Sequence, residues 1–409
     1  MATAAPDHIV DADGHVLEPP DGMVQYAPAK FRDRIWHIEV RNDGSEWVHY
    51  NGASRPAGGL ALAGTAGMSL EDRNRARSGK MRYADVRPGA FRPEPRLPDM
   101  DTEGIAQSVL YPTLLLGLPG VDDTEFAEVQ ANAYNEWLAD FCRHAPNRLF
   151  GAAVVPMQDV DRAVRSIRRA KKLGHVGVFL RPNPSIEGRK FIDPLYDPIW
   201  KTCQELELPI GLHPFLAPDM PGACRALGFG AMRAAGVDYG KGSTADPVRN
   251  LGNIFFSQAL ANPFDMIECV ALMCAGGILE RFPRLTVLFL EANGGWIVPI
   301  LERLDHHFEV FRWDVPDLTM KPSEYFRRQC FISFDPDEST LAFTAEHPLV
   351  GAERIIWASD YPHPDAKFPG VVAELEESTE ALTTAQRARI FGKNASELYH
   401  LPAYTGRPS

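Results

Sequence analysis

The chain lacks any apolar run of the roughly 18–20 residues that a membrane-spanning helix needs, so the sequence predicts no such helix. Residues 1–6 hold no basic segment followed by an apolar one, so we expect no secretory signal and a cytoplasmic location. Runs rich in Lys or Arg are also absent, and the formal net charge is −12. These features argue against binding to nucleic acid or to an anionic membrane, and they favour a small-molecule substrate.

The six cysteines include no CxxC pair and are scattered along the chain. Most of them lie in apolar surroundings, where a reduced cysteine behaves as a small hydrophobic residue. We therefore expect no disulfides. The cysteines are Cys142, Cys203, Cys224, Cys269, Cys274 and Cys330.

From residue 100 onward, short buried-strand patterns alternate with helical patterns, and with 409 residues the chain can fill one large core. An apolar run at 10–18 adds a further strand near the N-terminus. The total is eight strands, most of them followed by a helix, which is the pattern of an α/β fold of the (β/α)8 TIM-barrel type. A doubly wound open sheet is the alternative. The later strand patterns are 108–111, 149–155, 175–180, 209–213, 286–290, 330–334 and 354–359.

Two irregular segments interrupt this alternation. Residues 25–98 are rich in Gly, Pro and Arg, with a charged helical piece at 71–81, and residues 216–253 form the second segment. Long excursions of this kind act as lids or binding loops in compact enzymes, and partial disorder is the alternative for the first one. We interpret residues 1–409 as one barrel domain in which 25–98 is a lid insertion and 216–253 a second insertion.

The first strand pattern, at residues 10–18, ends in closely spaced acid and imidazole groups. Alternate side chains of a strand point to the same side, so Asp13 and His15 are expected to lie together. A carboxylate and a neutral imidazole suit Zn²⁺, Mn²⁺ or Fe²⁺, and they would form half of a metal site that later residues complete. The alternative is a loop in which Asp11 and Asp13 only accept hydrogen bonds from the backbone.

Polar residues follow most of the other predicted strands. Because TIM-barrel active sites lie at the C-terminal ends of the strands, these residues are predicted to meet at one mouth. They are Arg181 after the fourth strand, His213 after the fifth, Glu291 and Asn293 after the sixth, Asp335 after the seventh, and Asp360 with His363 after the eighth.

Five short motifs, in order along the chain, make the sequence similar to the amidohydrolase superfamily. Within it the sequence resembles the amidohydrolase-2 group, typified by 2-amino-3-carboxymuconate-6-semialdehyde decarboxylase and related metal-dependent enzymes. The motifs are Asp11–Pro20, Ile210–Pro214, Gly277–Arg284, Phe289–Trp296 and Trp357–Pro364.

The resemblance implies a divalent metal site at Asp13, His15, His213 and Asp360, with one or two ions of zinc, manganese or iron per chain. It also implies that Asp360 moves protons during the reaction. The decarboxylases of the group carry a histidine where this chain has Asn293, which cannot exchange a proton near neutral pH.

Other residues have two interpretations each. Glu291 lies two residues before Asn293 and so on the same side of a strand, where it could supply a carboxylate to the site or form a salt bridge inside the barrel. Arg181 could bind a substrate carboxylate through its planar fork or anchor a loop.

We interpret the protein as a metal-dependent hydrolase that acts on a small, carboxylate-bearing substrate through a metal-activated water. Asp360, Glu291, Asn293 and His363 are its expected catalytic residues. The first alternative is a metal-dependent, non-oxidative decarboxylase. The second is an O₂-dependent hydroxylase with two iron or manganese ions, because extra carboxylates suit these metals. An inactive barrel is disfavoured by the presence of His15, His213 and Asp360, and we expect a homodimer.

Overall fold

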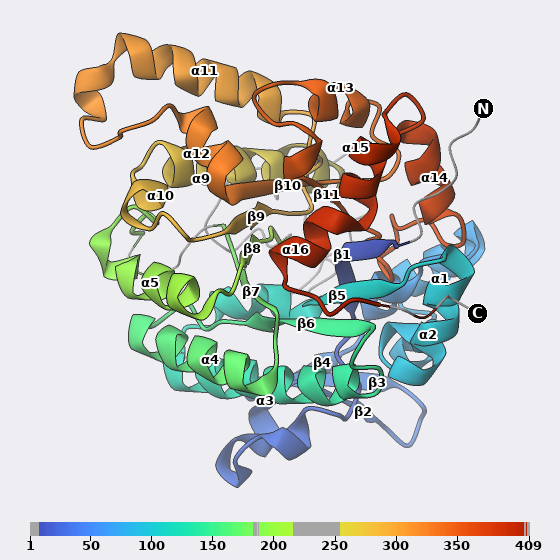
Figure 1. Ribbon diagram of the computed structural model, residues 1–409. Helices are drawn as coiled ribbons and strands as arrows, with labels where there is room; N and C mark the ends of the chain where they lie inside the picture. Colours follow the sequence, from blue (N-terminus) through green and yellow to red (C-terminus); the bar gives the residue numbers. More distant parts are fainter. Residues whose placement is uncertain (1–7, 183–185, 187, 216–253, 405, 407–409) are drawn as a thin grey trace.

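The computed structural model describes residues 8–182, 186, 188–215, 254–404 and 406. Eight parallel strands form one sheet, in which the strands are arranged in the order of the sequence. A separate small sheet is formed by the segment between the first and second of these strands. Helices surround these strands (Figure 1). The strands are β1 (Val10–Val16), β5 (Gln107–Pro112), β6 (Leu149–Val154), β7 (Gly177–Leu180), β8 (Ile210–Leu212), β9 (Val287–Phe289), β10 (Cys330–Phe334) and β11 (Ile355–Trp357).

Backbone hydrogen bonds just past the end of β11 join it to β1. The His15 N–H donates to the carbonyl of Tyr361 at 2.8 Å, and the Asp360 N–H donates to the carbonyl of Asp13 at 3.3 Å. All eight strands are buried along their whole length, as in a parallel sheet covered on both faces. The predicted (β/α)8 TIM barrel is confirmed, and the alternative of an open sheet is wrong.

The helices begin and end largely where local sequence signals place them. Asp159 accepts the N–H of Arg162 at 2.9 Å and so caps α4, while Gly174 ends this helix with a φ of 92°. The helices after β5 are α3 (Thr124–Arg143), α4 (Val160–Leu173), α5 (Asp197–Leu206), α8 (Ile254–Phe256), α9 (Asn262–Cys274), α10 (Ile278–Arg281), α11 (Ile297–Val310), α12 (Pro322–Gln329), α13 (Leu341–Glu346), α14 (Val371–Ser378), α15 (Thr384–Ala388) and α16 (Asn394–Leu398).

Residues 254–281 form several helical pieces. A π-helical turn, η9 (Ser257–Ala261), lies between α8 and α9. α9 ends at Cys274, and Gly277, with a φ of 81°, separates it from α10. Glycine adopts such a φ without steric cost, which explains the break.

The segment 25–98 contains strands that the sequence analysis does not predict. β2 (His37–Val40), β3 (Glu46–Tyr50) and β4 (Ala53–Pro56) form an antiparallel sheet, followed by α1 (Leu70–Arg77) and α2 (Pro93–Glu103). These strands have four or five residues and few buried positions, so their alternation is too short to stand out. The lid role of this segment stays a prediction, and the second expected insertion, 216–253, lies outside the described residues.

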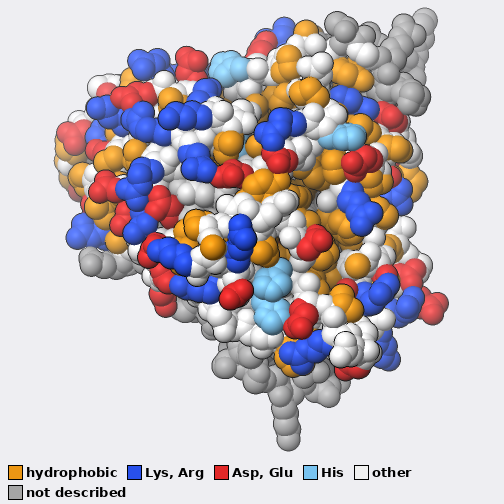
Figure 2. All heavy atoms as spheres, turned by 90° about the horizontal axis from the view of Figure 1, so that it is seen from below, with side chains coloured by type: hydrophobic (Ala, Val, Ile, Leu, Met, Phe, Trp, Pro, Cys, Tyr) orange, Lys and Arg blue, Asp and Glu red, His pale blue; other side chains and the backbone are white. Residues whose placement is uncertain are grey.

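On the face seen in Figure 2, side chains of both charge signs are intermixed over the surface. Within the described ranges, no helix combines the length and the apolar character that crossing a membrane requires. Five cysteines are described and all are free, while Cys224 lies outside the described residues. The expected homodimer and cytoplasmic location stay predictions.

Asp11 connects the strands on both sides of this closure. Its carboxylate accepts the hydroxyl of Ser108 at 2.8 Å, and the hydroxyl and N–H of Ser359 at 2.8 and 3.0 Å. Arg96 of α2 donates to the carbonyl of His15 at 2.6 Å. Asp11 therefore does accept a backbone hydrogen bond, and it holds β1 in register with β5 and with the loop after β11.

We expect Asp11→Ala to destabilise the fold by about 2–4 kcal/mol, because it leaves the buried donors of Ser108 and Ser359 without their acceptor. Chemical and thermal unfolding measure this loss. Asp33→Ala, which removes an exposed carboxylate, is the matched control and should leave stability unchanged. Equal unfolding midpoints for the two variants would contradict the role given to Asp11.

Candidate metal centre and active site

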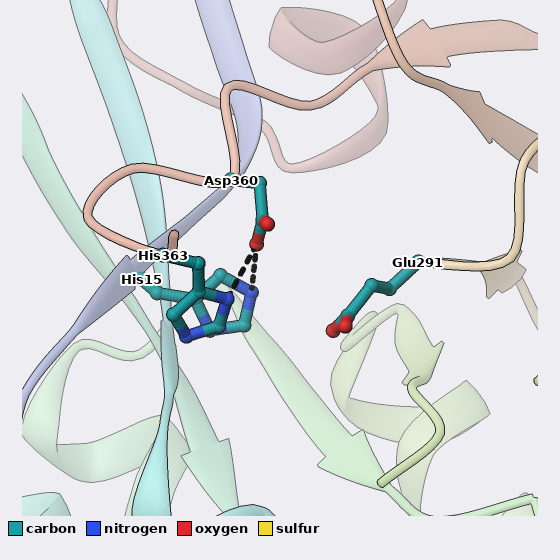
Figure 3. Close-up of side chains that lie close together, drawn as sticks. All are labelled: His15, Glu291, Asp360 and His363. Atoms are coloured by element: carbon teal, nitrogen blue, oxygen red, sulfur yellow. Dashed lines mark ion pairs between the residues drawn. The ribbon is translucent and has the colours of Figure 1, made fainter. Parts of the chain in front are cut away.

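Six acid and imidazole side chains meet at the C-terminal end of the barrel. They form two sets that share His15, and within each set the potential ligand atoms lie within 4.8 Å of one another. Figure 3 shows four of them, Glu291 facing the group of His15, Asp360 and His363 across a common space. The sets are Asp13, His15 and His213, and His15, Glu291, Asp360 and His363.

His15 lies at the centre of this cluster. Its Nε2 is 3.2 Å from Nε2 of His213, 3.4 Å from Oδ1 of Asp360 and 3.8 Å from Oδ1 of Asp13. Two ligands bound to one ion at about 2.0–2.2 Å lie no more than about 4.4 Å apart. Each of the other three residues that the sequence predicts as metal ligands therefore lies within this distance of His15, with Asp13 and His213 in one set and Asp360 in the other. The binding of one ion by all four stays a prediction.

The hydrogen bonds of the two histidines fix the direction of their free nitrogens. Nδ1 of His15 bonds to the carbonyl of Pro112 and Nδ1 of His213 to the carbonyl of Pro214, both at 2.8 Å. A carbonyl only accepts, so each Nδ1 donates its proton to a carbonyl and each Nε2 faces the cluster. When the two rings are neutral, both Nε2 lone pairs are available to a cation.

Oδ1 of Asp13 is buried without a hydrogen-bond partner among the described residues, while Oε2 of Glu291 and Oδ1 of Asp360 face imidazole nitrogens of His213 and His363 at 2.6 and 2.7 Å. A buried oxygen of this kind costs free energy unless a donor or a cation satisfies it. Carboxylates and imidazoles together suit zinc, manganese and iron. The residues present therefore fit a divalent metal ion.

Burial dominates the protonation of the cluster. It raises the pKa of Asp13 and Asp360 well above the usual range and lowers the pKa of His15 well below it. Burial also opposes the charge of His213, but the negative charge of Glu291, with Oε2 2.6 Å from Nε2, raises the pKa of His213 to about 9. Glu291 and His213 thus form an ion pair inside the cluster.

The residues after β9 do not continue the strand alternation. Glu291 and Asn293 have φ values of 43° and 55°, in the left-handed region that side chains other than glycine adopt at a cost of about 1–3 kcal/mol. The expectation that Glu291 and Asn293 share one side is wrong. Glu291 faces His213, whereas Asn293 Nδ2 donates to Oδ2 of Asp335 at 2.8 Å.

Asp335 lies outside both ligand sets. Burial raises the pKa of its carboxyl to about 8, and the negative charge of Glu338 adds to the effect. Asp335 and Asn293 line a different cavity from the one that opens beside His363.

His363 is tied to the cluster from one side. Its Nδ1 is 2.7 Å from Oδ1 of Asp360, its Nε2 is 3.1 Å from Oγ1 of Thr113, and its ring stacks on His15 with centroids 4.1 Å apart. The ring therefore holds the Asp360 carboxylate and the β5 loop in a fixed relation.

Arg181 follows β7 as predicted and is 2% exposed. Its Nη2 donates to the carbonyl of Phe215 at 3.5 Å, and it lines neither of the two cavities beside the cluster. This geometry agrees with the interpretation of Arg181 as a loop anchor, and its role in substrate binding stays a prediction.

Two cavities flank the cluster. The first has a volume of about 350 Å³ and largely apolar walls, with the rings of Trp36, Tyr50 and Phe215 and the guanidinium of Arg55 among its lining. The second, of about 390 Å³, is lined mainly by residues after β9, β10 and β11. The residues common to both are Gln258, Glu291 and Asp365.

Arg55 and Gln258 are site residues that the sequence analysis missed. Both lie in segments without a motif: Arg55 is in β4 of the 25–98 segment, and Gln258 is in the π-helical turn η9. For Arg55, the one feature of the sequence that could indicate a role at the site is its position in the predicted lid.

Comparisons with known proteins agree with this geometry. A 2-amino-3-carboxymuconate-6-semialdehyde decarboxylase from Dictyostelium discoideum is 25% identical over 278 residues, which cover 66% of this chain and 66% of that protein. A gamma-resorcylate decarboxylase from a Polaromonas species is 25% identical over 314 residues, covering 74% of this chain and 85% of that relative.

Solved structures share the fold. An amidohydrolase from Mycobacterium avium subsp. paratuberculosis superposes with a TM-score of 0.72 at 20% identity, covering 97% of this chain and 100% of that one. A dihydroxybenzoic acid decarboxylase from a Polaromonas species, solved with manganese and the inhibitor 2-nitroresorcinol, superposes with a TM-score of 0.62 at 19% identity, covering 97% of each chain.

The family model described as Amidohydrolase matches residues 10–401. The match runs from β1 through α16 and so includes every residue of the cluster. The chain therefore belongs to the amidohydrolase family.

Proposed function

We propose that this protein is a metal-dependent, non-oxidative decarboxylase of an aromatic or similarly unsaturated carboxylic acid. The observation that carries the proposal is the apolar, aromatic-walled cavity whose inner wall is formed by Glu291 and His363 of the cluster. The two relatives described above are decarboxylases by name. Decarboxylation, the first alternative in the sequence analysis, is therefore better supported than hydrolysis, which is the main interpretation in that analysis.

The metal ion would be held by Asp13, His15, His213 and Asp360. The unsatisfied Oδ1 of Asp13, the 3.4 Å between His15 Nε2 and Asp360 Oδ1, and the facing Nε2 atoms of the two histidines support this assignment. When bound, the ion supplies positive charge that fixes the substrate carboxylate and stabilises negative charge on a neighbouring oxygen.

The walls of the first cavity favour loss of CO₂. A carboxylate surrounded by apolar side chains loses hydration, and this environment disfavours the charged acid relative to neutral CO₂. Trp36, Tyr50 and Phe215 present flat ring surfaces suited to an aromatic or conjugated substrate.

Arg55 is the residue we assign to substrate binding in place of Arg181. It lines the same cavity, and its planar guanidinium can bind a carboxylate or phenolate oxygen with two parallel hydrogen bonds. The 25–98 segment would thus contribute directly to substrate selection, which is consistent with the predicted lid.

Asp360 is the proposed proton donor. Burial raises the pKa of its carboxyl well above the usual range, which is the direction that a proton donor needs. As the bond between the substrate carbon and its carboxylate breaks, the electron pair stays on that carbon and takes the proton of Asp360, and CO₂ leaves. His363, 2.7 Å from Oδ1 of Asp360, orients this carboxyl.

We expect the manganese-loaded protein to release CO₂ from hydroxylated aromatic carboxylates, with or without O₂. Isotope-labelled substrate and mass spectrometry of the headspace measure the release. Asp360→Asn should lower turnover by about 10²–10⁴-fold, because it removes the transferable proton, while Asp317→Asn, at an exposed position that lines neither cavity, is the matched control. Turnover that stops without O₂ would favour a hydroxylase, and amide or ester cleavage without CO₂ release would favour a hydrolase.

His213→Ala should lower metal content and activity together and leave the fold intact, because His213 contacts the cluster at the mouth of the barrel. The affinity for Mn²⁺ should fall by more than the about 10–100-fold that loss of an outer-shell partner costs. Metal analysis and circular dichroism are the measurements. The control is His306→Ala, an exposed histidine of α11, and full metal occupancy in His213→Ala would refute the assignment.

Arg55→Leu should lower kcat/KM by about 10–100-fold, mainly through KM, because a charge-assisted bond to the substrate contributes about 1.5–3 kcal/mol. Steady-state kinetics measure this loss on two substrates, one with and one without a second acidic group. Comparison of the two KM values shows which acidic group Arg55 binds. Arg77→Leu, at an exposed position of α1, is the control. An unchanged KM for every substrate would exclude Arg55 from substrate binding.

A further inference from the structure

Gln258 lies where the two cavities meet. It is half-buried in the π-helical turn η9, and it lines both cavities together with Glu291 and Asp365. Interaction with the Gln258 side chain contributes to the lowered pKa of the Glu291 carboxyl, after the larger effects of burial, which opposes it, and of His213. Gln258 therefore contacts the one carboxylate of the cluster that belongs to neither β1 nor the loop after β11.

The chemistry of the partners fixes the direction of the Gln258 amide. A carboxylate only accepts hydrogen bonds, so the amide must present its NH₂ group to Glu291. Its oxygen then points the other way, and Oε1 accepts from Nδ2 of Asn262 at 2.6 Å. Asn262 is 3% exposed, so this bond is shielded from water.

Asn262 also reaches the backbone of the same glutamate. Its Nδ2 lies 3.5 Å from the carbonyl of Glu291, so Asn262 contacts both the carbonyl and the glutamine that holds the side chain. Glu291 has a φ of 43°, a conformation that persists only where surrounding groups hold it. Asn262 is one such group.

The π-helical turn explains how these residues reach Glu291. The N–H of Asn262 bonds to the carbonyl of Ser257, five residues earlier, which adds one residue to the turn. Gln258 and Asn262, four residues apart, are neighbours on one helix face, and the pair faces the loop after β9. Single π turns occur frequently at functional sites.

We propose that Gln258 is a positioning residue that holds the Glu291 carboxylate toward the metal centre, and that Asn262 sets the orientation of the Gln258 amide. The proposal rests on the proposed function to the extent that Glu291 acts at a bound metal ion. It adds a second layer to the site, supplied by η9 and α9 rather than by the barrel strands.

The experiment is a double-mutant cycle on the affinity of the chelator-treated, full-length protein for Mn²⁺, followed by electron paramagnetic resonance of the free ion. Gln258→Leu should weaken Mn²⁺ binding by about 10–100-fold, the usual cost of losing an outer-shell partner. The same change in a Glu291→Gln background should have no further effect, because Gln258 acts through that carboxylate. Gln25→Leu, an exposed glutamine, is the control substitution, and circular dichroism checks the fold of each variant.

A second, nearly isosteric variant separates orientation from packing. Asn262→Asp places an acceptor where Gln258 Oε1 now receives a hydrogen bond, so the Gln258 amide should turn its oxygen toward Glu291 and weaken Mn²⁺ binding. In the Glu291→Gln background the new amide can donate to that oxygen, so Asn262→Asp should there be close to neutral. A merely structural role of Asn262 predicts the same loss in both backgrounds.

The outcomes distinguish this inference from the proposed function. If wild-type protein binds Mn²⁺ and the effects of Gln258→Leu and Glu291→Gln add, the positioning role is wrong while the metal-dependent function stands. An affinity of Gln258→Leu equal to that of the wild type overturns the inference as well. If the wild-type protein takes up no Mn²⁺, the proposed function fails first and the inference with it.

Discussion

The candidate site depends on the hydrogen bonds that close the barrel between its first and last strands. The pairs His15 N–H to Tyr361 and Asp360 N–H to Asp13 join segments more than 340 residues apart in the sequence, and they place Asp360 against His15. Asp11 accepts hydrogen bonds from Ser108 and Ser359 and so stabilises the same closure. Because the groups that close the fold are next to the groups that would hold the metal, stability and metal binding share one set of strands.

The cluster concentrates unfavourable features that a divalent ion would relieve. Oδ1 of Asp13 has no donor among the described residues, the Nε2 atoms of His15 and His213 face each other at 3.2 Å, and Glu291, Asn293 and Asp360 all have positive φ values. Backbone strain and unsatisfied polar groups persist where the surrounding structure holds them in place, and they occur most often at functional sites. Several independent observations therefore point to the same place on the barrel.

The two cavities beside this cluster differ in the polarity of their walls. The first is apolar and includes Arg55 from the small antiparallel sheet, so it suits the body of an unsaturated acid. The second is lined by acidic and amide groups such as Asp335 and Asn293, and Gln258 stands between the two. An aromatic acid would be bound by segments outside the barrel strands, whereas the chemistry would be done by residues at the strand ends, the usual division in this fold.

The sequence by itself determined the barrel, its strands to within a few residues, and the ligand candidates Asp13, His15, His213 and Asp360. The strands could be predicted because buried parallel strands have a strong local pattern, and the ligand set because the motifs that contain it resemble those of the amidohydrolase-2 group. Only the tertiary structure decided which way Glu291 and Asn293 point, since left-handed backbone after β9 cancels the alternation of a strand. It also decided the roles open to Arg55 and Gln258. Their partners lie on segments distant in the chain, and contacts of that kind leave no local pattern in the sequence.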